Sequence, residues 1–168
     1  GTPSSEITES VAQYDRIYCE WATNEKVGAE VAIGASIRGA RAMTCMKHVG
    51  VNVAADPLFT ASYVGVNGGL VFVAADDPGM HSSQNEQDSR NYARAAKLPM
   101  LEPSDSQECK DYLIKAYEIS EEYDTPVMLR LHTRVSHSRS IVDCVEPKEI
   151  TIRPYEKNID KYVMMPGM

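Results

Sequence analysis

The sequence predicts an α/β fold: a doubly wound, mostly parallel sheet with helices on both faces. Short segments rich in β-formers alternate with helical segments along the chain, which is the pattern of βαβ units. Residues 70–75 form a continuous apolar run, which is typical of a parallel strand buried on both faces. The chain has 168 residues, of which 43% are hydrophobic, and this is enough for one core.

The expected elements follow one another with short connections. A strand over residues 16–21 comes before a helix that starts at Asn24. Ser104 and Asp105 are a capping signal for a long helix over residues 106–123. The predicted strands are 16–21, 41–46, 70–75, 100–101 and 126–131, and the predicted helices are 24–38, 51–64, 87–96 and 106–123.

The C-terminal part of the chain differs in composition from the rest. Residues 133–168 are polar and rich in proline, and residues 145–152 are the one stretch there that we expect to be extended. We therefore predict one folded domain over residues 1–137 and a tail or linker over residues 138–168, leading toward domains downstream.

Charge and apolar content disfavour several classes of protein. The formal net charge is −7, and sequence-independent binding to nucleic acid or to anionic membranes needs a basic face. No apolar run approaches the roughly 20 residues of a membrane span. The first residues contain neither the basic nor the apolar segment of a signal peptide, so we expect a cytoplasmic protein.

Absent motifs disfavour further classes. The four cysteines contain no CxxC pair, which disfavours a zinc ribbon, a redox dithiol or an iron–sulfur cluster held by this chain alone. Reduced, mostly buried thiols are expected instead. The sequence also lacks a GxxxxGK[ST] phosphate loop, a GxGxxG after a strand and a GxSxG elbow.

Glu25 is the first candidate for chemistry. In parallel sheets, ligands bind at the carboxyl ends of the strands, and Glu25 lies at a predicted helix start directly after a predicted strand. Several glycines follow it, and each interior glycine costs a helix about 1 kcal/mol relative to alanine. Close packing or a bound ligand would account for them. The alternative is that Glu25 only stabilises the helix N-terminus through its dipole.

The connection over residues 75–88 is the second candidate. It is long and polar and follows the clearest strand, and loops at that place tend to bind ligands, although a solvated surface loop is the alternative. His48 and Asn52, after the strand at 41–46, are four residues apart and share one helical face. A histidine at a helix start has a structural role more often than a catalytic one.

Three further histidines could suggest a metal site. His81 lies in the polar loop, and His132 and His137 follow the last predicted strand. They lack ligand spacing and a specified carboxylate partner, so we predict no metal ligands in this chain.

Several segments resemble one known family. Residues 20–27 read EWATNEKV, residues 32–41 read AIGASIRGAR and residues 46–52 read MKHVGVN. Residues 55–58 read ADPL, and residues 76–88 read DDPGMHSSQNEQD. These segments are similar to the pyrimidine-binding thiamine diphosphate domain of 2-oxo acid:ferredoxin oxidoreductases, in particular the alpha subunit of the indolepyruvate type. The resemblance covers residues 1–137.

The resemblance implies a catalytic role for Glu25. In this family a glutamate at the corresponding place hydrogen-bonds the aminopyrimidine ring of thiamine diphosphate, which promotes loss of the proton from the thiazolium C2. That carbon then attacks a 2-oxo acid, and the cofactor acts as an electron sink. Glu25 is therefore both the predicted catalytic residue and a predicted cofactor ligand.

Weaker correspondences imply the other site residues. His48, Asn52 and His81 match polar positions that border the cofactor pocket. Thr2 and Ser4 match a Gly-Thr-Pro-Ser loop that lies near the substrate carboxylate, and His48 is expected to bind substrate as well.

The resemblance also implies what surrounds the domain. The complete enzyme would oxidatively decarboxylate aryl 2-oxo acids such as indolepyruvate, pass electrons through iron–sulfur clusters to ferredoxin and form acyl-coenzyme A. Expected partners are a diphosphate-binding domain of the same or a second subunit, a beta subunit, and further copies of the chain in a homo-oligomer.

The family pattern is incomplete in this sequence. The magnesium-binding Gly-Asp-Gly pattern, the cysteine-rich cluster segments and the family's first strand and helix are absent. Magnesium and the clusters are therefore expected in the complete enzyme but not on this chain. The chain would hold half of a cofactor site and would be inert alone.

Two other functions remain compatible with these residues. One is the same domain in another thiamine-dependent decarboxylase or transferase. The other is a non-catalytic α/β interaction module, in which Gly28, Ala32 and Ala35 would contact a partner and Glu25 would be exposed.

Overall fold

The most apolar strand of the sequence lies inside the sheet. In a computed structural model that describes residues 1–165, β2 (Leu70–Asp76) is buried along its whole length. It pairs with β1 (Ala42–Lys47) on one side and β4 (Val127–His132) on the other, and β3 (Met100–Leu101) pairs with β4. All pairings are parallel and the order is β1-β2-β4-β3, which confirms the predicted fold class.

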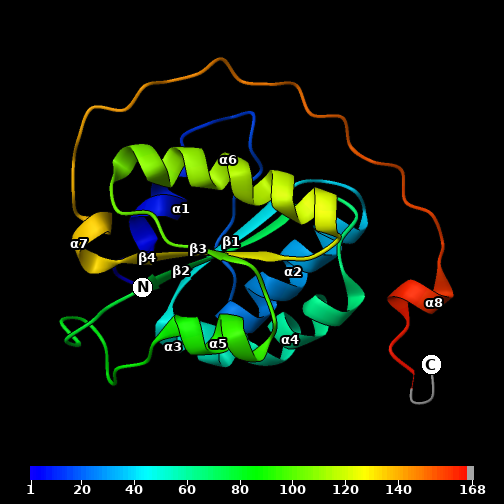
Figure 1. The fold of residues 1–168 in the computed structure, drawn as a ribbon, viewed down its shortest axis with the longest axis horizontal. Coiled ribbons are helices and arrows are strands. Elements are labelled where there is room, and N and C mark those ends of the chain that lie inside the picture. The colour runs from blue at the N-terminus through cyan, green and yellow to red at the C-terminus, as the bar shows by residue number, and fades with distance from the viewer. Residues whose placement is uncertain (166–168) are drawn as a thin grey trace.

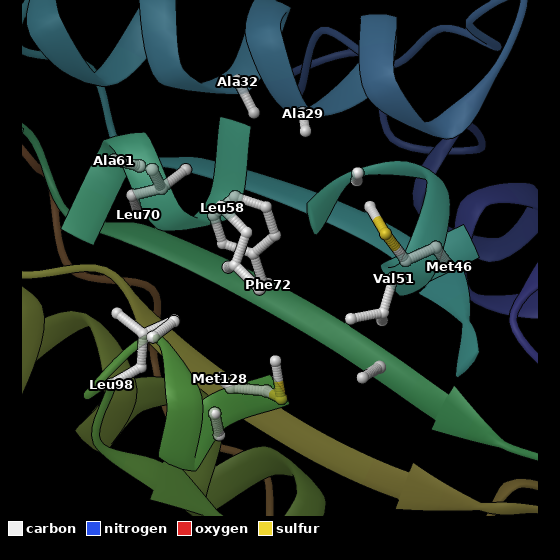
Figure 2. Packing of buried hydrophobic residues seen from close by; sticks show 14 of the residues in the cluster. Ala29, Ala32, Met46, Val51, Leu58, Ala61, Leu70, Phe72, Leu98 and Met128 are labelled. Carbon is white, nitrogen blue, oxygen red and sulfur yellow. The ribbon is translucent and has the colours of Figure 1, made fainter. Parts of the chain in front are cut away.

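Helices cover both faces of this sheet (Figure 1). Leu70, Phe72 and Ala74 of β2 pack on one face, and the residues between them pack on the other, because successive side chains of a strand alternate. The first face is covered by α2 (Glu25–Ile37), α3 (His48–Val53), α4 (Ala55–Val64) and α5 (Ser89–Ala95). Figure 2 shows Phe72 beside Leu58 of α4 on this face. The second face is covered mainly by α6 (Ser106–Tyr123), with α1 (Ser5–Val11) beside it.

Local capping explains where the main helices start. Asn24 caps α2 by accepting a hydrogen bond from the backbone of Val27, and Asp105 caps α6 in the same way. The helix predicted over residues 51–64 is instead two helices: α3 ends at Val53 and α4 begins at Ala55. Pro57 is tolerated in the first turn of α4, where a backbone N–H has no partner within the helix.

The strand expected over residues 16–21 does not form. These residues belong to no strand, and Tyr18 and Trp21 are 84% and 63% exposed. The prediction was wrong because β-forming side chains stabilise a strand only when a neighbouring strand pairs with it. Glu25 therefore follows a loop. Three short helices were not predicted: α1, α7 (Thr133–Ser136) and α8 (Ile159–Tyr162).

The C-terminal tail contacts the domain through a backbone hydrogen bond and an ion pair. It leaves α7, runs past α6 and reaches α8 on the opposite side of the molecule (Figure 1). There the backbone N–H of Arg153 donates to the Gly39 carbonyl at 3.1 Å, and the Lys161 ammonium lies 2.7 Å from the Asp124 carboxylate. Gly39 and Asp124 precede β1 and β4, so the tail binds the amino-terminal edge of the sheet. Residues 145–152 form no strand, and the domain boundary at residue 137 remains a prediction.

The cysteines are less buried than expected. All four are free thiols; Cys144 is exposed and the other three are partly buried. Burial, with a smaller contribution from Cys19, raises the pKa of the Cys45 thiol to about 12, so this side chain is protonated and unreactive at neutral pH. None of the helices within residues 1–165 is long and apolar enough to cross a membrane.

Candidate functional site

Three strands end at the same level of the sheet. Lys47 pairs with Ala75, and Ala75 pairs with Leu131, in the parallel register. The residues that follow these positions are therefore gathered at one edge, where the loop over residues 77–88 begins. Ligand sites of parallel sheets occur at this kind of edge.

The Glu25 side chain lies against α3, which begins at this edge. A methyl group on Gly50 would lie 2.6 Å from Cγ of Glu25 and 3.1 Å from its Cδ, so the two residues are in direct contact. Gly50 is in the first turn of α3, which begins directly after β1. The Glu25 side chain is partly buried. Among residues 1–165, no backbone or side-chain donor hydrogen-bonds its carboxylate, which is therefore available to a ligand.

His48 is fully buried and connects β2 to the polar loop. Its Nδ1 accepts a hydrogen bond from the backbone N–H of Asp77 at 3.2 Å, and its Nε2 lies 2.9 Å from the Asn85 carbonyl oxygen. Because a backbone N–H can only donate, the imidazole proton is on Nε2, which donates to Asn85. Both ring nitrogens thus position the loop, and direct contact of His48 with cofactor or substrate stays a prediction.

Asn52 supports the same loop from the next turn of α3. Its side-chain amide donates to the Tyr92 hydroxyl, which donates to the side chain of Gln87 at 2.7 Å. Gln87 in turn donates to the side chain of Asn85 at 2.8 Å. His48 and Asn52, which were predicted to share one face of a helix, therefore both stabilise the loop: His48 binds Asp77 and Asn85, and Asn52 reaches Gln87 through Tyr92.

Asp77 fixes the start of the loop. Its Oδ2 accepts hydrogen bonds from the backbone of Ser82 at 2.7 Å and from the Ser83 hydroxyl at 2.8 Å, and its Oδ1 accepts one from Thr133 at 3.1 Å. Burial by itself would raise the pKa of this carboxyl, but these donors outweigh it and lower the pKa to about 2.

The Asp77 carboxylate is expected to make stability depend on pH. Since its folded-state pKa is below the unfolded value, its contribution is present above about pH 4 and lost as the pH falls toward 2. We expect Asp77→Asn to remove about 2 kcal/mol of unfolding free energy at neutral pH and to flatten this pH dependence. Urea denaturation between pH 2 and pH 7 measures both. Asp15→Asn, at an exposed position, is the control; equal effects of the two variants would contradict the assignment.

Asp76 fixes the other end of the loop. Its buried carboxylate accepts hydrogen bonds from the backbone of Ser89 at 3.0 Å and from Nε of Arg130 at 2.8 Å. Arg130 also binds Glu102, which pairs with Arg90 at 2.6 Å. This network lines an open pocket of about 590 Å³. A larger hollow, of about 990 Å³, lies beneath the tail at the opposite edge.

The two aspartates were missed as functional candidates. The signal was present, because Asp76 and Asp77 directly follow the buried apolar strand and open the polar loop. Their partners Thr133 and Arg130 come from distant parts of the chain, so the sequence alone did not separate them from surface acids.

The remaining predicted residues lie in loops at this edge. His81 is exposed, and its ring folds over Gly79. Thr2 is exposed, whereas Ser4 is buried and its hydroxyl donates to the Gly1 carbonyl at 2.7 Å. Within residues 1–165, no cluster of three His, Cys, Asp or Glu side chains is arranged to hold a metal ion.

Comparison with known proteins identifies the family. Residues 2–166 match the family described as "Pyruvate flavodoxin/ferredoxin oxidoreductase, thiamine diP-bdg". The chain belongs to this family. This thiamine diphosphate-binding domain is also 50% identical to "Indolepyruvate oxidoreductase subunit IorA" of Archaeoglobus fulgidus and 54% identical to the subunit of the same name from Pyrococcus abyssi, over 99% of the chain in each case. It spans 28% and 27% of those relatives, about a quarter of their length.

Solved structures share the fold of the domain. A "2-oxoglutarate:ferredoxin oxidoreductase from Magnetococcus marinus" superposes with a TM-score of 0.72 at 19% identity, over 80% of this chain and 25% of that one. A "putative thiamin diphosphate-dependent enzyme isolated from Mycobacterium smegmatis" gives 0.61 at 17% identity, over 86% and 30%. The resemblance in family and fold is confirmed, and the individual residue roles remain predictions.

Proposed function

We propose that this domain supplies the pyrimidine-binding half of a thiamine diphosphate site in a 2-oxo acid:ferredoxin oxidoreductase of the indolepyruvate type. The observation that carries the proposal is the position of Glu25. Its carboxylate is partly buried, has no donor partner within residues 1–165, and lies against Gly50 at the carboxyl edge of the sheet. The names of the relatives support the reaction class.

The chemistry of the edge fits the cofactor. A carboxylate without a donor suits a ring nitrogen of an aminopyrimidine when that nitrogen carries a proton, and partial burial strengthens such a hydrogen bond. When bound, the cofactor supplies a carbon nucleophile and an electron sink for 2-oxo acids. Glu25 would hold the ring and exchange a proton with it, Gly50 leaves room for that carboxyl, and the loop over residues 77–88 would shield the site from water.

The remainder of the enzyme is part of the proposal. A diphosphate-binding domain, with magnesium, would complete the cofactor site from the same or a second subunit. A beta subunit, iron–sulfur clusters, ferredoxin and coenzyme A would receive the electrons and the acyl group, in a homo-oligomeric cytoplasmic enzyme. Because this chain holds only half of the site, we expect it to be inert alone.

The non-catalytic alternative is weakened by the packing of α2. Ala29 and Ala32 are buried in the core against the sheet, so Ala32 cannot contact a partner protein. The small residues there allow the helix to approach the sheet. Glu25 is also less exposed than an interaction module would require.

The test is turnover by the complete enzyme. Aryl 2-oxo acid, coenzyme A and an oxidised low-potential viologen are expected to give acyl-coenzyme A and reduced viologen, with higher kcat/KM than short aliphatic 2-oxo acids. Release of an aldehyde without use of coenzyme A or viologen would instead indicate a non-oxidative decarboxylase. Absence of turnover with every 2-oxo acid would favour an interaction module.

A further inference from the structure

Lys47 is a partly buried cation at the carboxyl edge of the sheet. It is the last residue of β1, and its ammonium donates to the Ser82 carbonyl at 2.7 Å and to the Ser83 hydroxyl oxygen at 3.2 Å. Within residues 1–165, no Asp or Glu forms an ion pair with it. Lys161, which is also partly buried, lies 2.7 Å from both carboxylate oxygens of Asp124.

An unpaired charge in this position needs an explanation. Partial burial removes water from an ammonium group, and such groups are ordinarily compensated by a carboxylate. The chain has a net charge of −7, so acidic partners are not scarce. An ammonium has three N–H donors, and the two oxygens that it binds here are neutral. One donor and the full charge remain for an anion.

The orientation of Lys47 is set by its neighbours. The Ser83 hydroxyl donates its proton to Asp77, so its oxygen can only accept from Lys47. Asp77 also holds the backbone of Ser82, the second acceptor of the ammonium. The lysine is therefore held by a hydrogen-bonded part of the loop, and a positioned charge binds an anion with little further loss of entropy.

The neighbours of Lys47 indicate the kind of anion that it would bind. A methyl group on Gly1 would lie 3.7 Å from Nζ of Lys47 and 3.3 Å from its Cε, so the N-terminal loop with Thr2 lies against this side chain. α3 begins at the residue after Lys47 and carries Gly50, which the Glu25 side chain contacts. Lys47 thus lies between the predicted substrate loop and the predicted cofactor residue.

We propose that Lys47 binds the carboxylate of the 2-oxo acid substrate, with Asp77 and Ser83 as its positioning residues. This inference rests on the proposed function. It adds a substrate-binding residue to the predicted Thr2 and Ser4, and it gives the polar loop the task of holding that residue in place.

The test compares two inhibitors of the complete enzyme that differ only in charge. 3-(Indol-3-yl)propanoate carries a carboxylate but cannot be decarboxylated, and its carboxamide is neutral and of the same size. Lys47→Gln keeps a donor for the Ser82 carbonyl but removes the charge. We expect it to weaken binding of the acid roughly ten- to hundredfold and to leave binding of the carboxamide unchanged. Lys47→Arg should restore most of the affinity for the acid.

Controls separate this inference from the proposed function. Lys161→Gln removes a partly buried lysine at the opposite edge and should change neither inhibition constant. The KM for 2-oxo acid should rise in Lys47→Gln, while C2 proton exchange of the bound cofactor, which needs no substrate, stays at the wild-type rate. Equal weakening of acid and carboxamide, or no weakening of either, would overturn the role of Lys47. Failure of the proposed function would show in the Glu25 variant described below.

Discussion

Replacement of Glu25 by glutamine in the complete enzyme should lower the rate of C2 proton exchange of bound thiamine diphosphate by about a hundredfold or more. Glutamine has the size of glutamate, so contact with Gly50 is retained. The amide cannot exchange a proton with the cofactor ring as a carboxyl can, so activation at C2 is lost. Exchange followed by NMR in deuterated buffer measures the effect directly.

The control for Glu25 is on the same helix. Glu30 lies on α2, is exposed, and is 4.0 Å from Lys26 in a surface pair. Glu30→Gln removes the same charge from the same helix, outside its first turn, so it reports any general effect of a lost charge on α2. We expect it to leave C2 exchange unchanged. If Glu25→Gln exchanged at the wild-type rate, the proposed function of this domain would be refuted.

The second large effect is expected from Gly50→Ala. The added methyl group would lie 2.6 Å from Cγ of Glu25 and 2.9 Å from Cβ of Met46, and neither distance is tolerated between carbon atoms. Either Glu25 or the first turn of α3 must move. We expect a loss of about 1–3 kcal/mol in unfolding free energy. C2 exchange should fall because the carboxyl no longer reaches its position.

A matched glycine provides the comparison. Gly34 is inside α2, and a methyl group there would meet nothing within 4 Å. Gly34→Ala should therefore stabilise the protein by about 0.5–1 kcal/mol, because alanine is the better helix former, and should leave C2 exchange unchanged. Thermal unfolding and exchange rates of both variants test the prediction. A wild-type rate of C2 exchange in Gly50→Ala would show that activation of the cofactor does not depend on the contact of Glu25 with Gly50.

Much of the fold could be predicted because its signals are local or periodic. The unbroken apolar run of β2 indicated a strand buried on both faces, and Asn24 and Asp105 marked helix starts by side-chain capping. The segment over residues 16–21 failed for the opposite reason. Its β-forming composition is local, but a strand requires a partner, and pairing is a property of the assembled sheet.

In the candidate site too, some features follow from the sequence and others only from the tertiary structure. The sequence by itself determined the family, the parallel sheet and the place of Glu25 at the start of a helix. Only the tertiary structure decided that His48 uses both ring nitrogens inside the protein, that Asp77 holds the polar loop, and that Lys47 has no carboxylate partner among residues 1–165. The physical reason is distance along the chain: the contacts of His48 and Lys47, and the contact of Asp77 with Thr133, join segments 29 to 56 positions apart, and burial and pairing arise only when those segments meet.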